Sequence, residues 1–307
     1  MKKTIIIYLF LFSFYVDSFS QCSFQWQLGS LNLEPRLWVS ADSTDIPPWE
    51  CDDQTPLPNL AVRDLNPTSS FNWIQSQFGS GSVVLGCNVR GVHNALQWTQ
   101  VAAAYHFSNS SNTTEDDFIH TESHTVVIIL KIDSLDANQA NVIFDNRDFN
   151  ASVATTNRGI TILHDTRNGL FDNNFRVKVG NQGEVVYEID KDNTFPTQVW
   201  SLAIVTFDED STNNAVKLRV NGLEVATTNR LAVPSAGLPQ RAAARIGERT
   251  GSSTTNWNLQ SCSGELHTFA VYPGVLDQES IEKIECWFQA EFRIESIIRR
   301  RGLRRVQ

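Results

Sequence analysis

The sequence predicts an all-β fold in which two antiparallel sheets pack against each other. Short apolar or alternating runs recur along the 307-residue chain and are separated by turn signals, as in a β-sandwich. Asn221-Gly222 lies between two such runs and is a strong hairpin signal, because both central residues of a type I′ turn need positive φ. A convincing helix pattern occurs only near the carboxyl end, at 276–284.

Residues 1–20 have the composition of an export signal. Lys2 and Lys3 begin it, an apolar run of about 12 residues follows, and small residues at 18 and 20 precede the expected cleavage site before Gln21. The apolar run is too short to span a bilayer comfortably, so a membrane anchor is the disfavoured alternative. We therefore expect a secreted or cell-surface protein without a transmembrane span.

The rest of the chain divides into one domain and a basic tail. No internal repeat or long linker interrupts 21–292, which we predict to be a single domain. The tail, 293–307, holds six arginines and one glutamate, whereas the whole chain has a net charge of −9. The domain is therefore strongly acidic, which argues against nucleic acid as a partner.

Five cysteines lie beyond the export signal, and an oxidising compartment would allow disulfides between them to persist. Their pairing cannot be deduced from spacing, and an odd count leaves at least one cysteine over. That cysteine is either buried or bonded to another chain. The five are Cys22, Cys51, Cys87, Cys262 and Cys286.

The expected strands follow one another as short runs. The opening strand is expected at 36–44, and the proline-rich segment 46–72 should be loop. The run 124–132 is continuously apolar, as in a central strand, and 175–179 alternates cleanly and should pair with 183–189. The other expected strands are 83–85, 95–98, 101–107, 141–144, 159–163, 200–207, 215–220, 223–227, 245–247 and 264–272.

Five pieces of the chain resemble, in this order, the laminin-G-like branch of the concanavalin A-like jelly rolls. They are the strand led by Trp200, the strand ending at Asn221-Gly222, Ile246-Gly247, the strand from Gly264-Glu-Leu to Val271-Tyr272, and a helix from Leu276 to Ile284 with Asp277 as N-cap. The resemblance implies a concanavalin A-like jelly-roll sandwich of two antiparallel sheets with a C-terminal helix. It implies little about activity, because such folds host many functions.

The resemblance also implies ligand binding through rim loops at one end of the sandwich, often with a calcium ion. Calcium prefers oxygen ligands, which loops rich in Asp and Asn supply, although these are also ordinary turn residues. The residues that would hold a metal stay unknown. Trp257 either stacks on a sugar or a partner or folds back onto the sandwich. The ligand-binding candidates are Asp145, Arg147, Asp165 and Trp257.

Glu188, Asp190 and Asp192 are the sharpest catalytic candidates. Alternate residues of a strand share a face, and a retaining glycosidase needs two carboxyl groups about 5 Å apart. One glycosidase family on this scaffold uses Glu-x-Asp-x-(x)-Glu, but Asp192 stands where Glu belongs and Lys191 replaces an apolar residue. A solvated strand end explains the same residues. We therefore expect no enzyme, with a glycoside hydrolase as the weaker alternative.

The function that the sequence favours is a secreted, non-catalytic module that binds a glycan or a protein partner at the cell surface, in recognition or adhesion. The alternative is a structural subunit of an extracellular or outer-surface assembly, joined through the tail or the odd cysteine. The tail is either a solvated end, a segment lying against the acidic domain, or a contact for an anionic partner. Its predicted partner-binding residues are Arg299, Arg300, Arg301, Arg304 and Arg305.

Overall fold

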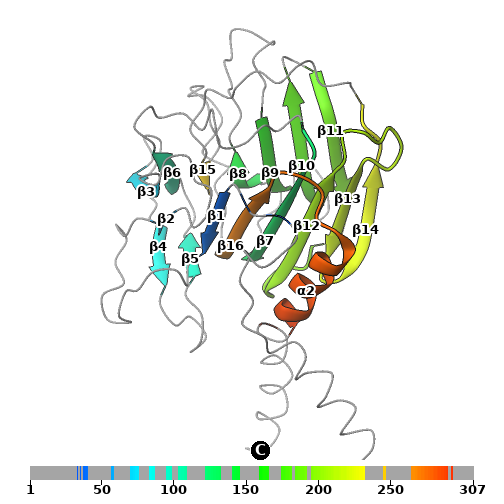
Figure 1. The fold of residues 1–307 in the computed structure, drawn as a ribbon. Helices are drawn as coiled ribbons and strands as arrows, with labels where there is room; N and C mark the ends of the chain where they lie inside the picture. Colours follow the sequence, from blue (N-terminus) through cyan, green and yellow to red (C-terminus); the bar gives the residue numbers. More distant parts are fainter. Residues whose placement is uncertain are drawn as a thin grey trace, which may run out of the picture. The chain divides into compact units, whose positions relative to one another are not determined.

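The computed structural model of the protein describes sixteen strands and one helix (Figure 1). Side chains are described for 33, 35, 122–132, 142–145, 159–164, 174–180, 185–191, 195–231, 264–289 and 292, and backbone alone at the remaining strand positions. The chain divides into two compact units, 33–275 and a unit made of 1–32 together with 276–307. The predicted domain 21–292 therefore takes in parts of both units.

The described strands form two eight-stranded antiparallel sheets, which confirms the predicted all-β sandwich. The first sheet has the order β14-β13-β12-β7-β16-β5-β4, and β1 also pairs with β16; the second has the order β11-β10-β9-β8-β15-β6-β3-β2. The first sheet contains β1 (Leu37–Ser40), β4 (Val83–Gly86), β5 (Ala95–Trp98), β7 (His124–Ile132), β12 (Ser201–Phe207), β13 (Val216–Val220), β14 (Leu223–Thr228) and β16 (Gly264–Tyr272). The second contains β2 (Leu57–Pro58), β3 (Ser70–Gln75), β6 (Ala103–Ser108), β8 (Ala140–Asp145), β9 (Gly159–Asp165), β10 (Asn174–Asn181), β11 (Glu184–Lys191) and β15 (Arg245–Ile246).

The central strand of the first sheet, β7, is buried on both faces. Val126, Ile128 and Leu130 enter the core between the sheets, while Val127 and Ile129, on the alternate positions, are also fully buried. A strand with two buried faces needs apolar residues at successive positions. This is why the sequence of β7 shows no alternation.

Aromatic side chains from the two sheets meet in the core. Phe144 of β8 stacks on Phe269 of β16 with the ring centroids 4.4 Å apart. Tyr187 of β11 lies 4.9 Å from Phe207 of β12 in the same sense. Burying a phenylalanine side chain completely stabilises a fold by about 1.5–3 kcal/mol relative to leaving it exposed. These contacts hold the second sheet against the first.

The β13–β14 hairpin turns at Asn221-Gly222, as predicted. Both residues have positive φ, 53° and 87°. The Asn221 side chain also reaches the neighbouring strand β12: its Oδ1 accepts from the Leu202 N–H at 3.0 Å, and its Nδ2 donates to Ser201 Oγ at 3.2 Å. Asn221 therefore shapes the hairpin and fixes it to β12.

The segment 46–72 differs from the prediction that it is loop, because it contains β2 and the first residues of β3. β2 is an edge strand of the second sheet, and it ends at Pro58. Proline is tolerated in an edge strand, where its missing N–H leaves no ladder bond unmade. Its proline content therefore indicated loop where the chain forms strand.

The helix α2 (Gln278–Phe288) belongs to the unit that contains 276–307. It is capped by Asp277, as predicted, with Asp277 Oδ1 accepting from the Ser280 N–H at 2.8 Å. It runs past the predicted end at Ile284 because Phe288 continues the buried face one turn further. Cys286 in its last turn is disulfide-bonded. No described helix is long and apolar enough to cross a membrane.

Candidate functional site

The strands β10 and β11 carry charged side chains on the face that points away from the core. Along β10, Phe175 and Val177 are buried in the core, whereas Arg176 and Lys178 lie at the alternate, partly exposed positions. Along β11, Ile189 is buried, and its neighbours Glu188 and Asp190 are partly exposed and exposed. The period of two in both strands thus produces what we call the β10–β11 polar face, which consists of Arg176, Lys178, Glu188 and Asp190.

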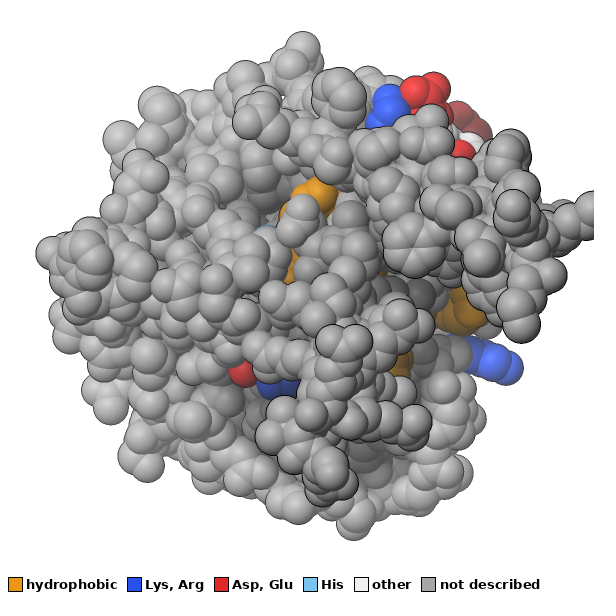
Figure 2. All heavy atoms as spheres, turned by 90° about the horizontal axis from the view of Figure 1, so that it is seen from below, with side chains coloured by type: hydrophobic (Ala, Val, Ile, Leu, Met, Phe, Trp, Pro, Cys, Tyr) orange, Lys and Arg blue, Asp and Glu red, His pale blue; other side chains and the backbone are white. Residues whose placement is uncertain are grey.

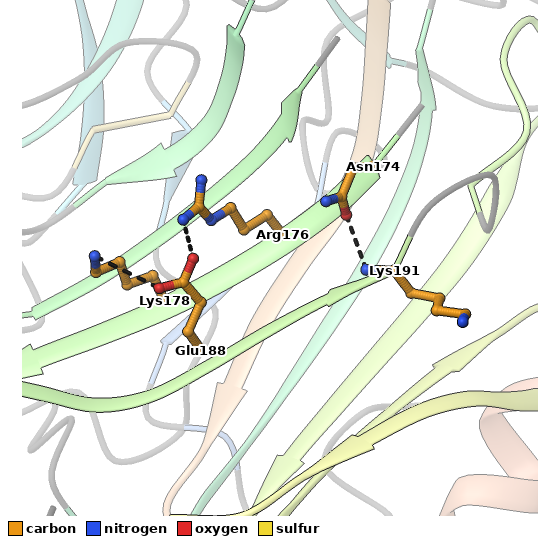
Figure 3. Close-up of polar contacts among 5 residues, drawn as sticks. All are labelled: Asn174, Arg176, Lys178, Glu188 and Lys191. Carbon is orange, nitrogen blue, oxygen red and sulfur yellow. Dashed lines mark hydrogen bonds and ion pairs between the residues drawn. The ribbon is translucent and has the colours of Figure 1, made fainter. Parts of the chain in front are cut away.

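Glu188 is the centre of the polar face (Figure 3). One of its carboxylate oxygens pairs with the Arg176 guanidinium and the other lies 3.6 Å from Lys178 Nζ. Lys178 is the direct cross-strand partner of Glu188, while Arg176 is opposite Asp190 and reaches Glu188 diagonally. The side chains of Arg176, Lys178 and Glu188 are 20%, 33% and 22% exposed. Two cations on one carboxylate favour its ionised form.

The open end of the β10–β11 pair is fixed by Asn174. Its side-chain Oδ1 accepts from the Lys191 backbone N–H at 2.9 Å (Figure 3). Asn174 itself is buried at the start of β10. The bond extends the ladder by a side-chain contact and keeps the last residues of β11 in register with β10.

A single row of residues, one from each strand, crosses seven strands of the second sheet. Each residue is the backbone partner of the next across the ladder. Cross-strand partners share a face of a sheet, so this row lies on the face that includes Glu188. We call it the polar row, because every member is a polar residue. From β3 to β11 its members are Asn72, His106, Arg245, Asp145, Thr161, Lys178 and Glu188.

The middle of the polar row is buried. Asp145 at the end of β8 and Thr161 of β9 are both almost completely inaccessible, and Thr161 Oγ1 donates a hydrogen bond to Asp145 Oδ1 at 3.1 Å. Asp145 was predicted as a ligand-binding residue from its place before a polar loop. Its described contact is instead with the neighbouring strand.

A buried polar pair lies on the core side of β11. His124 Nδ1 is 2.8 Å from the Glu122 carbonyl oxygen, which can only accept, so Nδ1 carries the proton. Nε2 therefore accepts from the Tyr187 hydroxyl at 2.9 Å. Burial lowers the pKa of His124 to about 4 and raises the pKa of Tyr187. The pair is thus neutral and joins the first sheet to the strand that carries Glu188.

The ligand-binding residues predicted from the sequence do not form one cluster in the described part. Asp145 ends β8, whereas Asp165 ends β9 and is the backbone partner of Ala140, at the other end of β8. Five residue steps along a strand separate their positions by about 17 Å. Arg147 and Trp257 lie outside the described residues, as do the tail residues Arg299, Arg300, Arg301, Arg304 and Arg305.

Of the three catalytic candidates, two are placed on one face. Glu188 and Asp190 share the outward face of β11, as the alternation predicted, and Asp192 lies outside the described residues. Among the described residues no group of three His, Cys, Asp or Glu is arranged to hold a metal ion. Calcium therefore stays a prediction from resemblance.

Sequence reasoning missed Arg176, Lys178 and Thr161 as members of a site. The signal for the first two was present, because Phe175-Arg-Val-Lys-Val179 alternates apolar and basic residues. That alternation was used only to identify a strand. Their pairing with Glu188 depends on the register between β10 and β11, which contains an irregularity after Val179.

Several solved structures are similar to this chain. A carbohydrate-binding module of the Ruminococcus gnavus IT-sialidase, CBM40, matches with a TM-score of 0.42 at 14% identity and covers 62% of this chain and 96% of its own. The ligand-binding domain of botulinum neurotoxin serotype D, solved with N-acetylneuraminic acid, matches with a TM-score of 0.51 at 11% identity, covering 84% and 52%. Domain 4 of the Geobacillus stearothermophilus arabinanase AbnA, solved with arabinotriose, matches with a TM-score of 0.47 at 14% identity, covering 84% and 99%.

At these identities the likeness concerns the fold alone, and no curated protein matches the chain. The sequence itself matches a laminin G family model, described as the concanavalin A-like lectin/glucanases superfamily, over residues 107–282. This match covers more than half of the chain and includes the second sheet from β8 to β11. Together with the two antiparallel sheets and the C-terminal helix, it confirms the jelly-roll fold. The chain belongs to the concanavalin A-like lectin/glucanases superfamily.

Proposed function

We propose that this protein is an exported, non-catalytic module that binds a glycan at the cell surface. The observation that carries the proposal is the β10–β11 polar face, where Glu188 is held by Arg176 and Lys178 on two paired strands of a lectin-superfamily sandwich. Export rests on the signal pattern of residues 1–20. Structures of similar fold solved with sugars support a glycan as the ligand class.

The polar face suits hydroxyl groups. A guanidinium presents several N–H donors in a plane, an ammonium presents three, and a carboxylate offers only acceptors. Sugar hydroxyls both donate and accept, so they can bond to each of these three groups. Side chains on paired strands are held more precisely than side chains on loops, and such precision favours a binding site.

The same contacts favour binding over hydrolysis. A glycosidase needs one carboxyl group that keeps its proton and acts as the acid. Two neighbouring cations oppose protonation of Glu188, because an opposite charge within a few ångströms favours the ionised form. This supports a carboxylate that accepts hydrogen bonds from a ligand. Should any hydrolytic activity be detected, Glu188→Gln would leave it unchanged under the proposal.

The proposal is tested with the mature protein, residues 21–307, on an array of glycans and on insoluble polysaccharides. A double variant, Arg176→Ala with Lys178→Ala, should lose most of the binding, at least tenfold in affinity. Lys217→Ala is the matched control, because Lys217 is an exposed lysine of β13 in the first sheet. Retention of no glycan by the wild-type protein would contradict the proposal. Fractionation of the producing cells tests export separately.

A further inference from the structure

Resting on the proposed function, we infer that the ligand is an uncharged polysaccharide chain that lies along the polar row, across the strands of the second sheet. The inference concerns both the place and the chemistry of the ligand. It places binding on the sheet face at Lys178 and Glu188, away from the rim loops that contain Arg147 and Trp257. It also excludes a polyanion as the preferred ligand.

The charges of the polar row alternate in sign. Arg245 is the backbone partner of Asp145, and Lys178 is the backbone partner of Glu188. The next pair on the same face, Arg176 and Asp190, repeats the balance. In the view of Figure 2, the described basic and acidic side chains likewise occur in mixed groups.

A balanced row selects against charged polymers. An anionic polysaccharide would place negative groups beside Glu188 and Asp190, and like charges that are brought together and desolvated oppose binding. A polycation would meet Arg176 and Lys178 in the same way. A neutral chain of hydroxyl groups carries no such penalty and can bond to both signs.

The shape of the row requires an extended ligand. Neighbouring strands lie about 4.8 Å apart, so seven members span about 29 Å. A single terminal sugar would occupy only a small part of that length. An extended chain that crosses the strands can follow the whole row.

The buried middle of the row and its accessible end have different roles. Asp145 and Thr161 are inaccessible and bonded to each other, so they are positioning residues that fix β8 to β9 beneath the row. The reachable charged atoms belong to the polar face on β10 and β11, where Lys178 is one-third exposed. Ligand contact is therefore concentrated at Arg176, Lys178 and Glu188.

The experiment measures affinity for two sets of soluble polysaccharides by affinity electrophoresis and titration calorimetry. The neutral set is a mixed-linkage β-glucan, a xylan and an arabinan, and the anionic set is polygalacturonate and polysialic acid. The variants are Glu188→Gln, Trp257→Ala as a rim variant, and Lys217→Met as a matched surface control. Thermal unfolding confirms that each variant is folded.

The inference predicts that the wild-type protein binds at least one neutral chain, with an affinity that changes less than twofold between 50 and 300 mM salt, on the order expected when few ion contacts form. Glu188→Gln leaves two cations without their carboxylate, so it should weaken neutral binding about tenfold and raise binding of the anionic set at low salt. Trp257→Ala and Lys217→Met should change neither.

Three results would overturn the inference. One is tighter binding of the anionic set with steep salt dependence. Another is loss of binding in Trp257→Ala with full binding in Glu188→Gln, which would place the site at the rim and leave the proposed function standing. The third is the absence of binding to every glycan on the array and to both sets, which would remove the proposed function as well.

Discussion

The Tyr187 hydroxyl donates a hydrogen bond to Nε2 of His124 across the core, 2.9 Å from oxygen to nitrogen. His124 begins β7 in the first sheet, and Tyr187 lies on β11 in the second, directly before Glu188. Both side chains are inaccessible. The bond therefore connects the central strand of one sheet to the strand that carries the centre of the polar face.

Tyr187→Phe should destabilise the protein by about 1–3 kcal/mol, because it leaves the buried Nε2 of His124 without its donor. Tyr272→Phe is a matched control: Tyr272 is equally inaccessible, and its hydroxyl has no hydrogen-bond partner in the described part of the chain. The control should change the free energy of unfolding by less than about 0.5 kcal/mol or raise it. Urea unfolding of the two variants measures the difference. Equal losses in both would contradict a role for the His124 bond.

The free energy of unfolding should fall as the pH drops from about 6.5 to about 4. Burial lowers the pKa of His124 to about 4, whereas an unfolded histidine titrates near 6.5. In that window the unfolded chain binds the proton and the folded chain does not, so acid favours unfolding. The full effect is roughly 3 kcal/mol, at about 1.4 kcal/mol for each pH unit of the shift.

His124→Gln tests this pH dependence, because glutamine does not titrate. Unfolding curves of wild type and variant should differ in slope between pH 6.5 and pH 4 and run in parallel above pH 7. Parallel curves throughout would show that His124 does not contribute to the acid sensitivity. Other carboxylates and histidines affect both proteins equally and cancel in the comparison.

Gly264→Ala should be strongly destabilising, by more than about 1 kcal/mol. Gly264 begins β16 with φ of 153°, and a Cβ there would lie 2.2 Å from the Lys131 backbone oxygen. Backbone on a central strand cannot move aside cheaply. Gly274→Ala provides a graded comparison, because a Cβ at Gly274 would meet only the Leu33 side chain, at 3.1 Å. Thermal unfolding should rank Gly264→Ala clearly below Gly274→Ala; the reverse order would contradict the clash.

The parts of the fold that are determined locally could be predicted from the sequence. β7 is an unbroken apolar run, the β13–β14 turn is Asn-Gly, and α2 begins at an aspartate N-cap, so each carries its own signal. β2 could not be predicted in this way, since Pro58 is compatible with an edge strand only once the neighbouring strands are known.

The site was less predictable because it depends on register. Glu188 and Asp190 were recognised by their spacing along one strand, but their partner Arg176 comes from another strand. A shift of one residue between β10 and β11 would turn every side chain of one strand to the opposite face. The distance between Asp145 and Asp165 likewise follows from the pairing of β8 with β9, which their sequence neighbourhoods do not encode.

The most direct test of the account is hydrogen–deuterium exchange of the mature protein, residues 21–307, with and without a polysaccharide that it retains. If the β10–β11 polar face is the binding site, added ligand should slow exchange in peptides covering 174–191 and leave 208–231 unchanged. Slowed exchange confined to the rim segments 145–148 or 251–260, with 174–191 unaffected, would contradict the assignment of the site to Arg176, Lys178 and Glu188.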